Sequence, residues 1–279
     1  MTTVTRSPAK NWALYIGLTF TVLLSIGPLL FMAIMASRLN DEILALPPPL
    51  SFGGELSKNV ERVFANADVT FAQALLNSLI VATVATICVV VTSSLAGFAL
   101  AKLKFRGRNV MLLFVIGTMM VPVQLGLIPL YMLMSKLGFA GKLESVTLPF
   151  LVAGFGVFMM RQYAIQAIPD EMIEAARVDG ASTFRIFFSI VFPAMRPAAA
   201  VLGLLTFMER WNDFLWPYLT LDAEHPTVQV ALSRLSSGYY SDQSLIMAGT
   251  LIGTLPLVIV FVVFGRQIIG GVMEGGLKA

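Results

Sequence analysis

Long apolar segments separated by short charged loops constrain this chain more than any other feature. A membrane-crossing helix needs about 20 apolar residues, and six stretches meet that length. They are residues 12–35, 74–100, 110–134, 145–167, 195–220 and 246–268. Only 13% of the 279 residues are charged, whereas soluble domains carry about 25%. The sequence therefore predicts an all-α polytopic membrane protein with six transmembrane helices. We expect one transmembrane domain over 1–279, with its core at 72–268.

Lysine and arginine residues are unevenly divided between the two sides of the predicted helices. The loop at 102–108 is strongly basic and contains no acid, and cytoplasmic loops are enriched in Lys and Arg. With this loop inside, most of the 19 basic residues fall on the same side. Both termini, the segment 168–194 and the tail 269–279 are therefore predicted to be cytoplasmic. The scatter of the basic residues through short loops argues against nucleic-acid binding.

Residue patterns typical of catalytic and nucleotide-binding sites are missing from the sequence. Gly141-Lys142 is followed by Leu143 and lacks the upstream glycine of a P-loop, so the chain is not expected to bind ATP. It has neither a nucleophile elbow nor a zinc-protease motif. The single Cys88 and the single His225 support no Cys/His metal site. We predict that the chain is not an enzyme and that it binds no cofactor or metal itself.

A charged insert at 168–194 interrupts the apolar pattern. Pro169 favours a helix start, and Gly180 is placed to end that helix in the left-handed conformation. Ser182 can cap a second helix over 183–192, which predicts a helix–turn–helix elbow at the membrane face. Lipid headgroups or a soluble partner would cover such an elbow. Helices that lie on lipid usually present a basic face, whereas this one is acidic, which favours the partner. Its acidic residues are Asp170, Glu171, Glu174 and Asp179.

This insert resembles the EAA loop of ABC importer permeases. The family pattern is E-A-A, three residues, G, nine residues, I, one residue, L-P, and the spacing matches throughout, with Phe192 in place of Leu. The expected coupling residues are Glu174, Ala175, Ala176, Asp179, Gly180, Ile190 and Pro193. The resemblance extends over nearly the whole chain, to permeases for carbohydrate uptake of the maltose and glycerol-phosphate type. It is carried by Asn77-Ser78-Leu79, Val121-Pro122, Trp211–Pro217 and Gly275-Gly276.

The resemblance implies a MetI-like type I importer permease fold in a bacterial inner membrane. In that family the EAA elbow docks onto a cytoplasmic ATPase dimer, whose closure switches the membrane helices between inward- and outward-facing states. The implied partners are a second permease subunit, two ATP-binding-cassette subunits that hold ATP and Mg, and an extracytoplasmic sugar-binding protein. The implied function is uptake of a sugar or sugar derivative. Gly275 and Gly276 in the tail are expected to contact the ATPase.

Polar residues near the end of the fifth apolar segment form a candidate substrate path. At 1.5 Å per residue, Arg210 lies about 20 Å along the helix from Pro197, and ionisable groups at such depth usually face a cavity or each other. Arg210 is expected to pair with Asp213, and Asn212 and Trp216 to share one face that suits a sugar. The same residues are also explained by an alternative, an aromatic belt that anchors the helix at the outer membrane interface. The candidate set is Asn77, Gln124, Glu209, Arg210, Trp211, Asn212, Asp213 and Trp216.

Several alternatives remain open at the level of sequence. Asn77 and Gln124 would either line the path or form interhelical hydrogen bonds. The charged residues at 209–213 would also suit a proton or ion relay in a secondary transporter that works alone. The importer would instead carry glycerol phosphate if Arg210 recognises it, or a polyamine if the acids do. His225, in the loop with Tyr239 and Tyr240, is expected to be solvated and to face the external binding protein.

Overall fold

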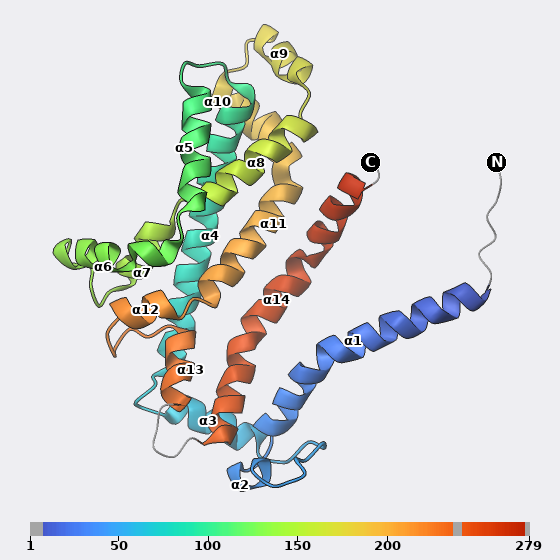
Figure 1. Ribbon diagram of the computed structural model, residues 1–279, viewed down its shortest axis with the longest axis vertical. Coiled ribbons are helices and arrows are strands. Elements are labelled where there is room, and N and C mark those ends of the chain that lie inside the picture. The colour runs from blue at the N-terminus through green and yellow to red at the C-terminus, as the bar shows by residue number, and fades with distance from the viewer. Residues whose placement is uncertain (1–7, 237–241, 277–279) are drawn as a thin grey trace. The chain divides into compact units, whose positions relative to one another are not determined.

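The computed structural model describes residues 8–236 and 242–276 (Figure 1). These residues form helices and include no β-strand. The chain divides into two compact units: one comprises Met1–Val69 with Leu232–Leu255, and the other comprises Thr70–Ala231 with Pro256–Ala279. The first is called unit 1 below and the second unit 2.

Unit 1 holds α1 (Pro8–Ala36), α2 (Asn40–Ile43), α3 (Leu56–Ala65) and the start of α14 (Gln243–Gly276). Buried Asn59 on α3 donates hydrogen bonds to the carbonyls of Ala36 (3.0 Å) and Arg38 (2.9 Å). Arg62 pairs with Asp242 at 2.6 Å, just before α14. These bonds hold α3 against the end of α1 and the start of α14.

Three long helices make the core of unit 2: α4 (Phe71–Lys102), α8 (Gly154–Ala167) and α11 (Phe192–Trp211). Glycine brings α4 and α8 very close, since a Cβ added at Gly97 would lie 2.8 Å from the backbone nitrogen of Arg161. A Cβ at Gly156 would collide with the hydroxyl of Ser93. Small residues at such contacts are how membrane helices approach each other.

The third apolar segment is sharply bent. It forms α5 (Arg108–Met120), the 3₁₀ turn η1 (Val123–Gly126) and α6 (Leu127–Lys136), with 88° between the two halves. Pro122 lies at the break, where it offers no backbone N–H to continue the helix. The expected span at 110–134 is therefore not one straight helix. By length and composition, five described helices can cross a membrane, or six if this bent pair counts as one span.

The fourth and fifth spans combine several elements. Residues Leu143–Ala167 comprise α7 (Leu143–Thr147), the 3₁₀ turn η2 (Leu148–Phe150) and α8. Residues Thr183–Trp211 comprise α10 (Thr183–Ile186), the π-helical turn η3 (Phe187–Val191) and α11. Beyond them lie α12 (Leu215–Thr220) and α13 (Val228–Ser236).

The fifth span differs from its expected limits at both ends. The helix predicted over 183–192 is not separate but runs on into α11. Pro193 lacks an N–H for the preceding turn, and the wide π turn at 187–191 absorbs this loss without a break. At the other end α11 stops at Trp211 rather than continuing to 220. A proline ring clashes with the carbonyl four residues earlier, so Pro217 opposes an uninterrupted helix through Asp213.

Candidate functional site

The elbow between α8 and α10 is formed by α9 (Asp170–Val178) and the turn after it. Pro169 occupies the position before the helix, as predicted. At the other end Gly180 has φ of +78°, and its N–H donates to the carbonyl of Arg177 at 3.0 Å. The N–H of Ala181 donates to the carbonyl of Ala176 at 2.9 Å. These two bonds are the Schellman C-cap that glycine favours, so the predicted helix end is confirmed.

Ser182 caps the next helix, as expected. Its hydroxyl accepts a hydrogen bond from the backbone N–H of Arg185 at 3.3 Å. Capping at 180–182 turns the chain between α9 and α10 by local bonds alone. In Figure 1, α9 lies beyond the ends of α4 and α8, at the same end of unit 2 as α10.

The two faces of α9 have opposite surroundings. Ile173 and Ala176 are buried in the main apolar cluster of unit 2, together with residues of α4, α8, α10 and α11. Glu174 and Ala175 are exposed on the outer face, and Met172 is 47% exposed. The buried face of α9 therefore contains Ile173 and Ala176, whereas Met172 lies largely outside it. Ala176 is turned inward, so Ala175 is the small residue of the motif that lies open to close approach.

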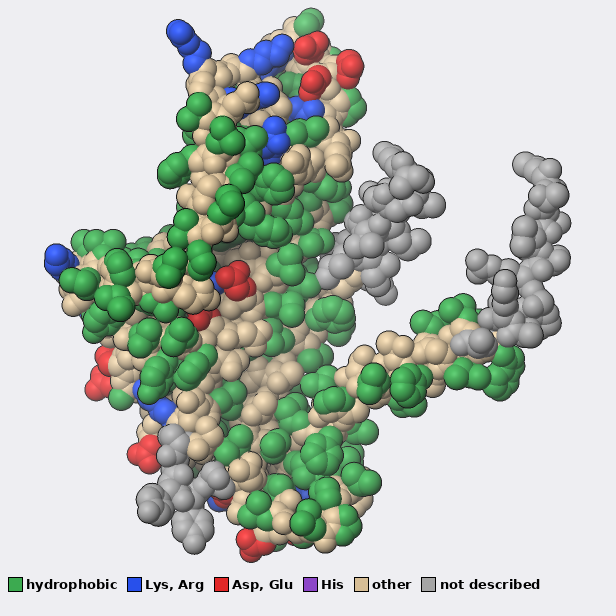
Figure 2. All heavy atoms as spheres, in the orientation of Figure 1, with side chains coloured by type: hydrophobic (Ala, Val, Ile, Leu, Met, Phe, Trp, Pro, Cys, Tyr) green, Lys and Arg blue, Asp and Glu red, His purple; other side chains and the backbone are tan. Residues whose placement is uncertain are grey.

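Charges at this end of unit 2 are mostly exposed (Figure 2). Glu174 and Arg177 form no ion pair with each other, although their i, i+3 spacing permits one, and neither has another partner among the described residues. Lys102, the last residue of α4, does reach α9, where its Nζ lies 2.6 Å from Oδ1 of Asp170. The hydrogen bond from Lys102 and the charge of that lysine lower the pKa of Asp170 below its ordinary value. One ion pair thus joins α4 to the first residue of α9.

The remaining coupling candidates lie away from the exposed face of α9. Asp179 is the exposed residue that precedes the glycine. Ile190 and Pro193 are half-buried, Ile190 in the π turn and Pro193 at the start of α11. Gly275 and Gly276 are the last residues of α14, so the expected tail begins as a continuation of the final helix. Their contact with an ATPase stays a prediction.

Arg210 organises the charged cluster at the far end of α11. Its guanidinium bonds Glu209 and lies 3.3 Å from Oδ2 of Asp213. The Cζ atom also lies 4.2 Å from the ring centroid of Phe150 on η2, which is a cation–π contact. The side chain of Arg210 is only 11% exposed, whereas that of Glu209 is 69% exposed. The expected pairing of Arg210 with Asp213 is confirmed.

The break after Trp211 separates two residues that were expected to share a face. Trp216 on α12 is 2% exposed and donates its indole N–H to the carbonyl of Ser145 at 2.9 Å. Asn212 is exposed, and its amide oxygen lies 3.4 Å from Nε2 of Gln229. The predicted common face is therefore wrong, because it assumed a continuous helix. Trp211 is also buried, stacked on Phe207.

Asn77 and Gln124 occupy contrasting environments. Asn77 is fully buried on α4 and donates to the carbonyl of Pro226 at 2.9 Å. The hydroxyl of Ser78 accepts from the N–H of Val228 at 2.8 Å, so adjacent residues hold the segment before α13 against α4. Hydrogen bonding is thus the role that the contacts give Asn77. Gln124 is exposed on η1, at the bend, and its side chain has no hydrogen bond within the described part of the chain.

The side chain of His225 is 42% exposed, and its Nδ1 lies 2.8 Å from Oδ1 of Asp222. The same carboxylate accepts the backbone N–H groups of Glu224 and His225. Burial alone would raise the pKa of Asp222, but the hydrogen bonds from His225 outweigh it and the pKa is lowered. Tyr239 and Tyr240 lie outside the described residues.

Some residues that build these two regions were not identified from the sequence. Lys102 was noted only as part of a basic loop, and its contact with Asp170 crosses 68 positions. Phe150, Ser145 and Gln229 carried no signal, because each acts through a contact with a distant helix. The helix break after Trp211 did have a sequence signal, which is Pro217.

The fold defines a polytopic helical membrane protein with a helical elbow at one end of unit 2. The family model for the binding-protein-dependent transport system inner membrane component matches residues 90–270. The chain belongs to this family: it is a permease subunit of a binding-protein-dependent ABC transport system, an inner-membrane component and not an enzyme.

Curated relatives match along almost the entire chain. The arabinooligosaccharides transport system permease protein AraQ of Halalkalibacterium halodurans is 33% identical over 275 residues, 98% of both chains. The lactose transport system permease protein LacG of Rhizobium radiobacter is 33% identical over 279 residues, 100% of both chains. The sn-glycerol-3-phosphate transport system permease protein UgpE of Yersinia pestis is 30% identical over 268 residues, 93% of this chain and 95% of that relative.

A solved structure shares the fold. It is a bacterial ABC transporter involved in the import of the acidic polysaccharide alginate, with a TM-score of 0.79 and 22% identity. The match covers 95% of this chain and 100% of that chain. The predicted type I importer permease fold is confirmed.

Proposed function

We propose that this chain is one of two membrane subunits of an ATP-driven importer, and that a separate cytoplasmic ATPase moves it through α9. The observation that carries the proposal is the opposite burial of the two faces of α9. Glu174 and Ala175 face outward, available to a partner, while Ile173 and Ala176 pack into the core. Because packed interiors transmit displacement, a partner that moves α9 also moves α8 and α11. ATP and Mg would bind the ATPase.

We propose a sugar or sugar derivative as the cargo. Two relatives named for arabinooligosaccharide and lactose transport support this class. The end of α11 supports a neutral cargo, since Arg210 is already surrounded by Glu209 and Asp213. The neighbouring amides of Asn212 and Gln229 offer donors and acceptors that suit hydroxyl groups.

Glycerol phosphate is the second candidate, because one relative is named for its transport. A phosphate would need a free cation, and Arg210 would have to leave its two carboxylates to provide it. The pairing of Arg210 with Glu209 and Asp213 also argues against a proton relay in a transporter that works alone, because both carboxylates are bonded to a fixed cation. For a polyamine, exposed Glu209 is the one carboxylate of the cluster that lies mostly open.

We further propose that the α9 end of unit 2 and both termini are cytoplasmic. The basic loop between α4 and α5 lies at this end (Figure 1), in accordance with the enrichment of Lys and Arg in cytoplasmic loops. An extracytoplasmic sugar-binding protein and a second permease would complete the assembly.

Affinity purification of the tagged chain from its own membranes in mild detergent tests the assembly. We expect a P-loop ATPase, a second permease and a binding protein, and ligand screening of that binding protein then identifies the cargo. Selective binding of a neutral sugar supports the proposal, whereas selective binding of glycerol phosphate supports the second candidate. Reproducible recovery of the chain alone, together with uptake that follows the proton gradient at constant ATP, would contradict the importer.

Charge reversal of the motif glutamate tests docking at α9. Glu174→Lys is expected to reduce uptake at least about tenfold, the effect of losing roughly 1.4 kcal/mol of coupling, while membrane insertion stays normal. The same charge change at exposed Glu144, which lies on α7, is the matched control and should leave uptake near the wild-type level. Wild-type uptake in Glu174→Lys would contradict coupling at α9.

A further inference from the structure

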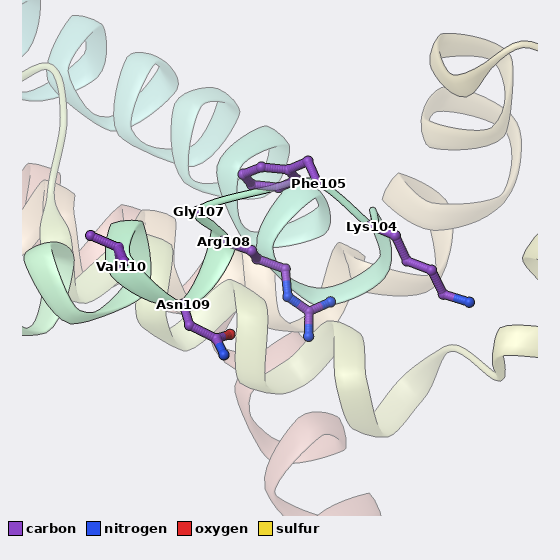
Figure 3. Close-up of a pocket in the computed structure, with 6 residues that line it drawn as sticks. All are labelled: Lys104, Phe105, Gly107, Arg108, Asn109 and Val110. Atoms are coloured by element: carbon purple, nitrogen blue, oxygen red, sulfur yellow. The ribbon is translucent and has the colours of Figure 1, made fainter.

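The loop between α4 and α5 forms a pocket that neither the elbow nor the charged cluster on α11 uses. It is open and shallow, with a volume of about 470 Å³. Arg108 and Asn109 extend in the same direction from the first turn of α5, and Lys104 extends from the preceding loop (Figure 3). The lining residues are Lys104, Phe105, Gly107, Arg108, Asn109 and Val110.

No acidic side chain among the described residues forms an ion pair with the cations that line this pocket. Lys104 and Arg106 have no ion pair or hydrogen bond through their side chains within the described residues. Arg108 makes a single long hydrogen bond, 3.4 Å from Nη1 to the carbonyl of Leu103. Asp170, whose carboxylate feels the charges of Lys104 and Arg108, is already bonded to Lys102. Lys104 and Arg106 therefore face solvent without an ion pair, and part-buried Arg108 also has no ion pair among the described residues.

The start of α5 adds further donors to the same place. Gly107 precedes the helix with φ of +87° and has no side chain that could cap it. The first N–H groups of an α-helix have no intrahelical acceptor, and the positive end of the helix dipole favours an anion there. Lys104, Arg108 and the first turn of α5 line the same open pocket, which suits a phosphate group.

An apolar surface continues directly from the cationic pocket. Val110 is 70% exposed and Phe114 is 74% exposed, and α5 contains no buried residue. Phe105, in the loop itself, is 41% exposed. A free phosphate ion would use the cations alone and would leave this surface uncovered. A phospholipid fits both parts, because its phosphate and its acyl chains meet at the boundary between polar and apolar groups.

We propose that this pocket binds the headgroup of an anionic phospholipid. The phosphate lies between Lys104, Arg108 and the first turn of α5, while the acyl chains follow the exposed face of α5 from Val110 onward. Basic residues next to a membrane helix are attracted to anionic lipid, and here they line a defined pocket at the end of a helix. The proposal requires only that α5 lies in a bilayer, and it is independent of the cargo and of ATPase docking.

Lipid selectivity of the wild-type complex gives the first test. The purified complex is titrated with phosphatidylglycerol or phosphatidylcholine of the same chain length, and bound lipid is counted by native mass spectrometry. We expect at least about tenfold preference for phosphatidylglycerol, and no competition from inorganic phosphate at equal concentration. Equal binding of the two lipids would overturn the proposal, as would full displacement by inorganic phosphate, which would identify a free anion as the ligand.

Variants assign the selectivity to this pocket. Lys104→Gln/Arg108→Gln should weaken phosphatidylglycerol binding by about thirtyfold, the effect of two cations near an anionic surface. Lys104→Arg/Arg108→Lys keeps both charges and should retain the affinity. Lys136→Gln/Lys142→Gln removes two exposed cations elsewhere in unit 2 and should change it less than twofold. If the first variant binds within twofold of the wild type, or the distant variant loses as much, the proposal fails.

Discussion

Charged side chains have opposite surroundings in the two regions that flank the fifth span, namely α9 before it and the cluster around Arg210 at its far end. At the α9 end, Glu174 and Arg177 stay exposed and unpaired. At the far end, Arg210 is 11% exposed, bonded to two carboxylates and stacked over Phe150. An exposed unpaired charge adds little to stability and remains available to a partner, whereas a desolvated charge must be compensated within the fold. The comparison agrees with the proposal that the first end is recognised by a partner, whereas the contacts of Arg210 at the second end stabilise the region around the helix break.

The largest effect on uptake is expected from disrupting the turn at Gly180, which ends α9. Gly180→Pro places a residue restricted to φ near −65° at a position with φ of +78°. The Schellman bonds are lost and α9 is reoriented, so uptake should fall by at least about tenfold, with normal insertion in the membrane. Gly180→Asn is the matched control, since asparagine tolerates the left-handed region, and it should retain most uptake. Wild-type transport by the proline variant would show that the turn does not position the docking surface.

The second prediction concerns stability at the other end. Arg210→Met leaves Asp213 without its cation in a mostly desolvated place, and this should lower the free energy of unfolding by about 3 kcal/mol. The measurement is thermal unfolding of the purified complex, combined with the double variant Arg210→Met/Asp213→Asn. The double variant should recover part of the loss, because no unpaired carboxylate remains. An Arg210→Met protein of unchanged stability but impaired cargo uptake would instead place Arg210 in the substrate path.

A smaller effect distinguishes packing from cargo contact at Trp216. Trp216→Phe removes the indole N–H that bonds the carbonyl of Ser145, and should lower the free energy of unfolding by about 1 kcal/mol. The KM for uptake should stay at the wild-type value, because the ring is buried. Kinetics and thermal unfolding on the same preparation separate the two roles. A raised KM with unchanged stability would instead indicate that Trp216 contacts the cargo.

The smallest effect concerns the ion pair between Lys102 and Asp170. The pKa of Asp170 is depressed in the folded protein, so its contribution to local stability is present above the ordinary value of 3.8 and is lost as pH falls through the depressed value. Asp170→Asn should increase hydrogen exchange of the α9 amides slightly at pH 7 and equally at pH 5. The difference from the wild type should vanish only in acid below 3.8. A difference that disappears between pH 7 and pH 5 would contradict the role of this carboxylate.

The elbow could be predicted from sequence because its geometry is determined by neighbouring residues. A left-handed glycine, a serine cap and a proline at the helix start act within a few positions, so 169–182 behaves as the pattern indicates. The direction of each alanine in the motif could not be predicted in the same way. Whether Ala175 or Ala176 faces the core depends on where α4, α8 and α11 lie around α9.

The far end of α11 could be predicted only in part. The pairing of Arg210 with Asp213 follows from their spacing, and the break before α12 follows from Pro217, a signal that the assumption of one long helix concealed. The contacts of Arg210 with Phe150 and of Trp216 with Ser145 join segments about 60 to 70 positions apart. Such contacts depend on how the helices pack, which hydrophobic periodicity does not specify.

The backbone contact at Gly97 has a mechanical consequence. Where helices meet through side chains, rotamer changes can absorb a displacement of a few tenths of an ångström before the neighbouring helix responds. At Gly97 the backbone of α4 lies against that of α8 with no such compliant layer between them. A displacement of α8 at this contact is therefore passed to α4 through the backbone, without first being absorbed by a change of side-chain rotamer.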